Sequence, residues 1–120
     1  MKNFRDMRVW EKAHTFVLRM YDVTKSFPKS ELYGLTNQLR RAAVSIPANL
    51  AEGCGKNTDP EFARYIDIAS GSASETDYLT LLARDLKFIG PDVYGEMFEE
   101  ITAIRKMLTA LKKTVKSADR

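Results

Sequence analysis

The chain has 120 residues, of which 44% are apolar and 29% are charged. This size suits one domain over residues 1–120 with a buried core, and no apolar run approaches the roughly 20 residues of a membrane-spanning helix. The N-terminus lacks the apolar region of a signal peptide and Cys54 is the single cysteine, so no intrachain disulfide forms and we expect a soluble, cytoplasmic protein.

The first two predicted helices cover residues 7–25 and 31–53. Apolar residues of the first recur with helical spacing, and a Phe-Pro pair ends it. Ser30 is the expected N-cap of the second, and Gly53 and Gly55 the expected stop. The predicted core residues are Val9, Trp10, Ala13, Phe16, Val17, Met20 and Tyr21 in the first helix, and Leu35, Leu39, Ala42, Ile46 and Leu50 in the second.

The third and fourth predicted helices cover residues 60–89 and 92–115. Thr58 and Glu61 have the spacing of a capping box, although an Asp-Pro pair is a competing cap. The predicted core residues are Phe62, Tyr65, Ile66, Ala69, Ala73, Thr76, Leu79, Leu82, Ala83 and Leu86, then Tyr94, Met97, Ile101, Ile104, Leu108, Leu111 and Val115. No segment alternates like a strand. The sequence therefore predicts an all-α, antiparallel, up-down-up-down four-helix bundle.

Helix two has a second apolar side. Residues 42–51 carry no charge, and Val44, Ala48 and Ala51 lie nearly opposite the core stripe on a helical wheel. Pro47 removes a backbone hydrogen bond and should kink the helix. A lone bundle normally leaves one side of each helix wet, so Val44, Pro47, Ala48 and Ala51 are predicted to contact another copy of the chain. The alternative is packing within one bundle.

Helix three contains a matching uncharged stretch at residues 69–74. A glycine inside a helix costs roughly 1 kcal/mol relative to alanine. We therefore expect Gly71 to permit a close approach to helix two.

Basic charge is concentrated at the two ends of the chain. Residues 1–30 hold seven Lys/Arg against three Asp/Glu, and residues 101–120 hold six against one, within a net charge of +3. The predicted nucleic-acid-binding residues are Arg105, Lys106, Lys112, Lys113 and Lys116, which share one side of helix four with Arg120, together with Arg40 and Arg41. Binding would be directed at the phosphate backbone, because no aromatic residue is interleaved with these cations. The alternative is that they complement the helix dipole and keep the surface solvated.

No pattern indicates catalysis, a metal or a cofactor. Glu11 and His14 have the spacing of a di-iron motif, but the chain holds one histidine and such sites need a second motif. Glu96, Glu99 and Glu100 lie in an early turn of helix four, where the dipole favours acids. We expect no enzymatic activity.

Several blocks resemble the four-helix-bundle proteins encoded in 23S rRNA intervening sequences. The blocks are residues 4–13, 27–53, 61–65 and 68–75, and helix two carries the most specific of them. The resemblance implies a left-handed bundle that assembles into a homopentameric ring, in a family without a settled biochemical function. The family is similar to the accessory variability protein of diversity-generating retroelements, a basic pentamer that associates with a reverse transcriptase and nucleic acid.

Together these observations predict an oligomeric scaffold or adaptor. The expected partners are further copies of the chain and RNA, DNA or a reverse-transcriptase-like protein. The alternative is a structural or protein-binding ring without nucleic-acid contact.

Overall fold

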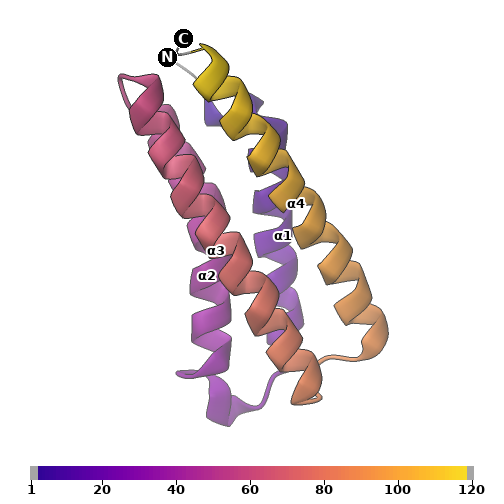
Figure 1. Ribbon diagram of the computed structural model, residues 1–120. Coiled ribbons are helices and arrows are strands. Elements are labelled where there is room, and N and C mark those ends of the chain that lie inside the picture. The colour runs from indigo at the N-terminus through magenta and orange to yellow at the C-terminus, as the bar shows by residue number, and fades with distance from the viewer. Residues whose placement is uncertain (1–2, 119–120) are drawn as a thin grey trace.

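The computed structural model describes residues 3–118 and is all-α over that range (Figure 1). Residues 3 and 118, where the described chain begins and ends, lie at one end of the molecule, and the connecting segments 25–34 and 86–90 lie at the other (Figure 1). The prediction of four helices without strands is confirmed for these residues. The elements are a 3-10 turn (Phe4–Asp6), α1 (Arg8–Thr24), a 3-10 turn (Lys29–Glu31), α2 (Leu35–Cys54), α3 (Asp59–Asp85) and α4 (Pro91–Ala118).

Helix α2 begins at Leu35, later than the sequence pattern indicated. A 3-10 turn occupies the preceding segment, and the Leu35 N–H donates to the Glu31 carboxylate at 3.1 Å. The prediction of Ser30 as N-cap was therefore wrong: Gly34 holds that position without a side-chain bond, and the carboxylate of Glu31 satisfies the free amide instead.

Helix α3 ends at Asp85 rather than at residue 89. Lys87 adopts the left-handed conformation with φ of 66°. The Phe88 N–H donates to the Ala83 carbonyl and the Lys87 N–H to the Arg84 carbonyl, both at 2.9 Å, which is the Schellman pattern. Sequence reasoning missed this stop because it looked for glycine, the residue that adopts positive φ most readily.

The start of α3 matches the sequence prediction. Thr58 is the N-cap, and its hydroxyl accepts from the Glu61 N–H at 3.3 Å and donates to the Glu61 carboxylate at 2.9 Å. The capping box is confirmed over the competing Asp-Pro cap.

The predicted apolar stripes form the core. All five residues of the α2 stripe are buried. Two aromatic or apolar residues depart from the prediction: Tyr21 is 41% exposed beneath the Arg40 guanidinium, which lies 4.6 Å from its ring centroid, and Leu86 is 48% exposed because it lies beyond the end of α3. The largest fully buried side chains include Phe16, Met20, Leu39, Ile46, Leu50, Ile66, Met97, Ile101, Ile104 and Leu108.

Gly53 and Gly71 have the opposite roles to those that the sequence suggested. Gly53 does not stop α2; it is buried within the helix, and an added Cβ would lie 2.8 Å from the Tyr65 Cβ and 2.9 Å from Phe62. Gly71 is exposed, and an added Cβ would meet no atom within 4 Å. The expectation that Gly71 serves a close approach to helix two was wrong within the single chain.

The seams, by which we mean the lines of contact between neighbouring helices, differ in how extensively the helices pack. α3 packs extensively against both α2 and α4, whereas α1 contacts α4 much less. A cleft of about 480 Å³ therefore remains between α1 and α4. Within residues 3–118, no helix combines the length and the apolar character needed to cross a bilayer.

Candidate subunit and nucleic-acid interfaces

The second apolar side of α2 is exposed in the single chain. Val44 is 37% exposed, Ala48 is exposed and Ala51 is partly exposed. We call these three residues the α2 strip. They lie opposite the buried stripe, so the sequence separated the two sides of this helix correctly.

Pro47 is not part of that exposed surface. Its side chain is buried within the bundle, and α2 continues through it. The Asn49 amide donates to the Ser45 carbonyl at 2.7 Å and to the Ser45 hydroxyl at 2.9 Å. These bonds place polar groups beside the proline.

Helix α3 extends the α2 strip. The hydroxyls of Ser45 and Ser72 lie 2.7 Å apart and join the two helices. Ile68 lies one turn before Ser72 and is 40% exposed. Sequence reasoning placed Ile68 in no interface, because its position next to α2 depends on how the helices pack.

Arg40 is occupied within the chain. Its Nε donates to the Thr24 hydroxyl at 2.7 Å and its Nη2 to the Tyr21 carbonyl at 3.3 Å. A cation at the carbonyl end of α1 complements the helix dipole. The structure thus places Arg40 at the α1–α2 junction, where its guanidinium binds two acceptors of α1.

Two of the predicted cations on α4 are also paired. Arg105 donates to the Asp77 carboxylate at 2.9 Å and to the Ser74 hydroxyl at 3.2 Å. Lys112 forms an ion pair with Asp67. These contacts tie α4 to α3, so both cations already have anionic partners.

The remaining predicted cations on α4 point outward. Lys106, Lys113 and Lys116 are exposed and form no ion pair with another residue in 3–118. We call these three lysines the α4 basic face. Arg41 is exposed too, but α2 and α4 do not contact each other in the described part of the chain, so it belongs to a different surface. Arg120 lies outside the described residues.

Three residues of the acidic and histidine motifs, His14, Glu96 and Glu100, contact other side chains of the bundle. The His14 ring stacks on Trp10 with centroids 5.0 Å apart. Glu96 and Glu100 both pair with Arg19, and the hydrogen bond to Glu96 raises the pKa of the Arg19 guanidinium. Among residues 3–118, no three His, Cys, Asp or Glu side chains are grouped to hold a metal ion.

Cys54 lies in the core. It is buried, and its Sγ is 3.2 Å from the Met7 sulfur. This environment is that of a packed apolar side chain.

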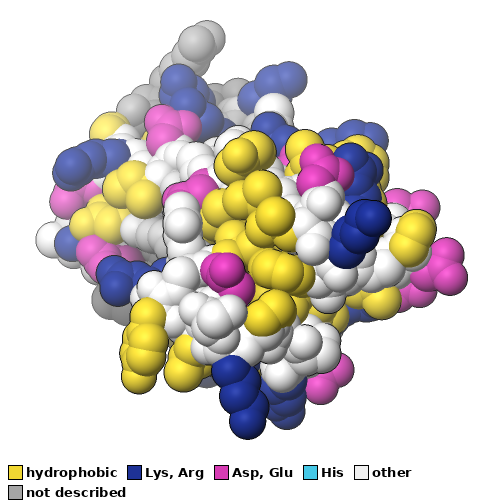
Figure 2. Space-filling view, turned by 90° about the horizontal axis from the view of Figure 1, so that it is seen from below, with side chains coloured by type: hydrophobic (Ala, Val, Ile, Leu, Met, Phe, Trp, Pro, Cys, Tyr) yellow, Lys and Arg dark blue, Asp and Glu magenta, His cyan; other side chains and the backbone are white. Residues whose placement is uncertain are grey.

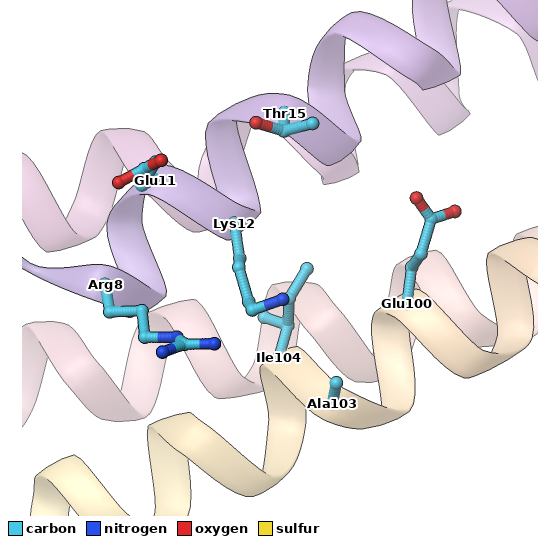
Figure 3. Close-up of a pocket in the computed structure, with 7 residues that line it drawn as sticks. All are labelled: Arg8, Glu11, Lys12, Thr15, Glu100, Ala103 and Ile104. Atoms are coloured by element: carbon cyan, nitrogen blue, oxygen red, sulfur yellow. The ribbon is translucent and has the colours of Figure 1, made fainter.

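The α1–α4 cleft was not predicted from the sequence. Charged side chains from both helices border it (Figure 3). Its formation depends on the spacing between two helices, which no local pattern reports. The lining residues are Arg8, Glu11, Lys12, Thr15, Glu100, Ala103 and Ile104.

Apolar side chains also gather on the end of the bundle that holds the α1–α2 and α3–α4 connections (Figure 2). Tyr33 is 92% exposed in the first connection, near Leu32 in sequence at 48%. Leu86 adds an exposed apolar side chain at the start of the second connection. Surfaces of this kind commonly mark protein contacts.

Comparison with known proteins identifies the family. The chain superimposes with a TM-score of 0.81 on a crystal structure from Bacteroides thetaiotaomicron described as a protein with unknown function from the S23 ribosomal protein family. The two are 25% identical, and the match covers 88% of this chain and 95% of the other. No curated protein matches the chain. A model of the 23S rRNA-intervening sequence protein family matches residues 5–110, which confirms the resemblance seen in the sequence: the chain belongs to this family.

Proposed function

We propose that the protein is a non-enzymatic cytoplasmic scaffold whose copies assemble into a ring and display basic surfaces to nucleic acid or to a nucleic-acid enzyme. In this proposal the bundle is antiparallel, up-down-up-down and left-handed, and the ring is a homopentamer. The observation that carries it is the division of the α4 cations into paired and unpaired sets. Arg105 and Lys112 are held by α3, whereas Lys106, Lys113 and Lys116 remain directed to solvent.

Assembly is supported by the α2 strip and its extension. Val44 and Ile68 are large apolar side chains with 37% and 40% exposure on neighbouring helices. The small side chain of Ala48 on the α2 strip allows another backbone to approach closely. Burying this patch against a second copy would remove it from water, which favours association.

Phosphate binding is supported by the α4 basic face. Three lysines on one helix create a modest positive electrostatic potential. A symmetric assembly repeats these lysines in every subunit and so strengthens the potential. A polyanion that contacts several subunits then gains binding free energy from each of them, because each contact releases counterions. Because the face holds lysines without aromatic neighbours, recognition would depend little on base sequence.

The direct test is binding of RNA and DNA oligonucleotides as a function of salt. The proposal expects binding at low ionic strength that weakens steeply as salt rises, and loss of that binding when the α4 basic face is removed. Absence of any oligonucleotide binding at low salt would refute the nucleic-acid part.

A ring that binds protein alone is the second candidate. It is favoured by the exposed apolar end of the bundle, where Tyr33 is 92% exposed. The same experiment separates the two candidates, because a purely protein-binding ring predicts no salt-dependent oligonucleotide binding.

A further inference from the structure

The charge pattern across the α1–α4 seam changes partway along its length. Arg19 of α1 lies opposite Glu96 and Glu100 of α4 and pairs with both, at 3.3 Å for the Glu100 contact. Positive charge on α1 is thus neutralised by α4 in this half of the seam.

In the other half of the seam, the cations of α1 have no acidic residues of α4 opposite them. Arg8 and Lys12 lie on the same edge of α1, but α4 carries no Asp or Glu from Ile101 to Ala118. Both cations line the cleft opposite Ala103 and Ile104. Neither forms an ion pair with another residue in 3–118.

The side chains converge on the cleft. Figure 3 shows Arg8 and Lys12 extending from α1 toward α4. The cleft therefore offers a guanidinium and an ammonium that form no ion pair within the described part of the chain.

Two carboxylates border the cleft and would repel an anion. Glu100 extends from α4 at the far end of the cleft, where it shares Arg19 with Glu96 and its buried Oε2 accepts no hydrogen bond from the described residues. Figure 3 shows Glu11 on the side of α1 that faces away from α4. The electropositive part of the cleft is therefore the part beside Arg8 and Lys12, away from Glu100.

We propose that the α1–α4 cleft binds the phosphate group of a nucleotide. Arg8 would bind two phosphate oxygens at once, and Lys12 would supply a point charge. Two cations suit the double charge of a phosphate monoester better than the single charge of a carboxylate. The cleft of about 480 Å³ has the size of small-molecule sites, and the partly exposed Ala103 gives the sugar or base an apolar contact.

The test is equilibrium dialysis of the intact protein against AMP at low salt, with adenosine as the ligand that lacks phosphate. The variant is Arg8→Gln/Lys12→Gln. The matched control is Lys25→Gln/Lys29→Gln, which removes the same charge beyond the other end of α1. We expect AMP to bind and adenosine not to bind. The site variant should weaken AMP binding tenfold or more, because a hydrogen bond to a charged group contributes about 1.5–3 kcal/mol and 1.4 kcal/mol is tenfold. The control variant should bind AMP as the unmodified protein does.

A second ligand distinguishes a free nucleotide from a unit of a strand. If the site variant also loses binding of a short oligoribonucleotide, the phosphate belongs to a strand; if only AMP binding is lost, it belongs to a free nucleotide. Removing the α4 basic face should leave AMP binding intact. Failure of the nucleotide site can therefore be distinguished from failure of the proposed nucleic-acid function. Absence of AMP binding by the unmodified protein, or equal weakening in site and control variants, would overturn the proposal.

Discussion

Gly53 of α2 lies directly against Tyr65 of α3, so that a Cβ added to the glycine would come within 2.8 Å of the tyrosine Cβ. That distance is shorter than two non-bonded carbon atoms tolerate. The Tyr65 Cβ cannot move away easily, because it is bonded directly to the backbone of α3. We predict that Gly53→Ala destabilises the protein by about 1–3 kcal/mol through overpacking. Chemical denaturation monitored by circular dichroism measures this directly.

Gly71→Ala is the matched control, because it makes the same substitution in a helix with open space around it. It should stabilise the protein by about 1 kcal/mol, since alanine forms helix more readily than glycine. A loss of stability at Gly71 as large as that at Gly53 would contradict the assignment of the close approach to Gly53.

Lys87 holds the left-handed position after α3 with φ of 66°. A lysine pays a steric cost there that glycine avoids, of about 1–2 kcal/mol. We predict that Lys87→Gly raises the free energy of unfolding by about 1 kcal/mol, despite the greater freedom of glycine in the unfolded chain. Thermal melts of the two proteins under one buffer condition test it, and a clear decrease in melting temperature would contradict the Schellman geometry.

The α2 strip should control assembly. We predict that Val44→Glu and Ala48→Glu each reduce the oligomer, because a buried carboxylate without a partner is costly at a subunit contact. Ala110→Glu introduces the same charge at an exposed alanine of α4 and should leave assembly unchanged. Native mass spectrometry measures the distribution of species. A monomer of 13.6 kDa as the only species of the unmodified protein would refute the ring.

The α4 basic face should set the salt dependence of nucleic-acid binding. Replacing its three lysines with glutamine should lower affinity and reduce the slope of log affinity against log salt by about 2 for each subunit that contacts a single strand. The control removes three lysines elsewhere, namely Lys25, Lys29 and Lys56. Fluorescence anisotropy at several salt concentrations reports both quantities, and equal losses in the two variants would indicate general charge rather than this face.

Sequence reasoning anticipated the parts of this protein that depend on neighbours along the chain. The apolar repeat in α4, the capping box of Thr58 and Glu61, and the two apolar sides of α2 are all visible in local spacing, because a helix fixes which residues share a side. The family resemblance rested on the same local blocks, above all that of α2.

Tertiary structure decided which side chains remain available to bind a partner. Arg40, Arg105 and Lys112 look like their exposed neighbours in sequence, yet each is paired with a residue of another helix. Gly53 and Gly71 are both glycines in helices, and only the distance to the next helix distinguishes them. The α1–α4 cleft and its unmatched cations arise from the register of two helices far apart in the chain. These contacts depend on packing geometry, which a one-dimensional pattern does not contain.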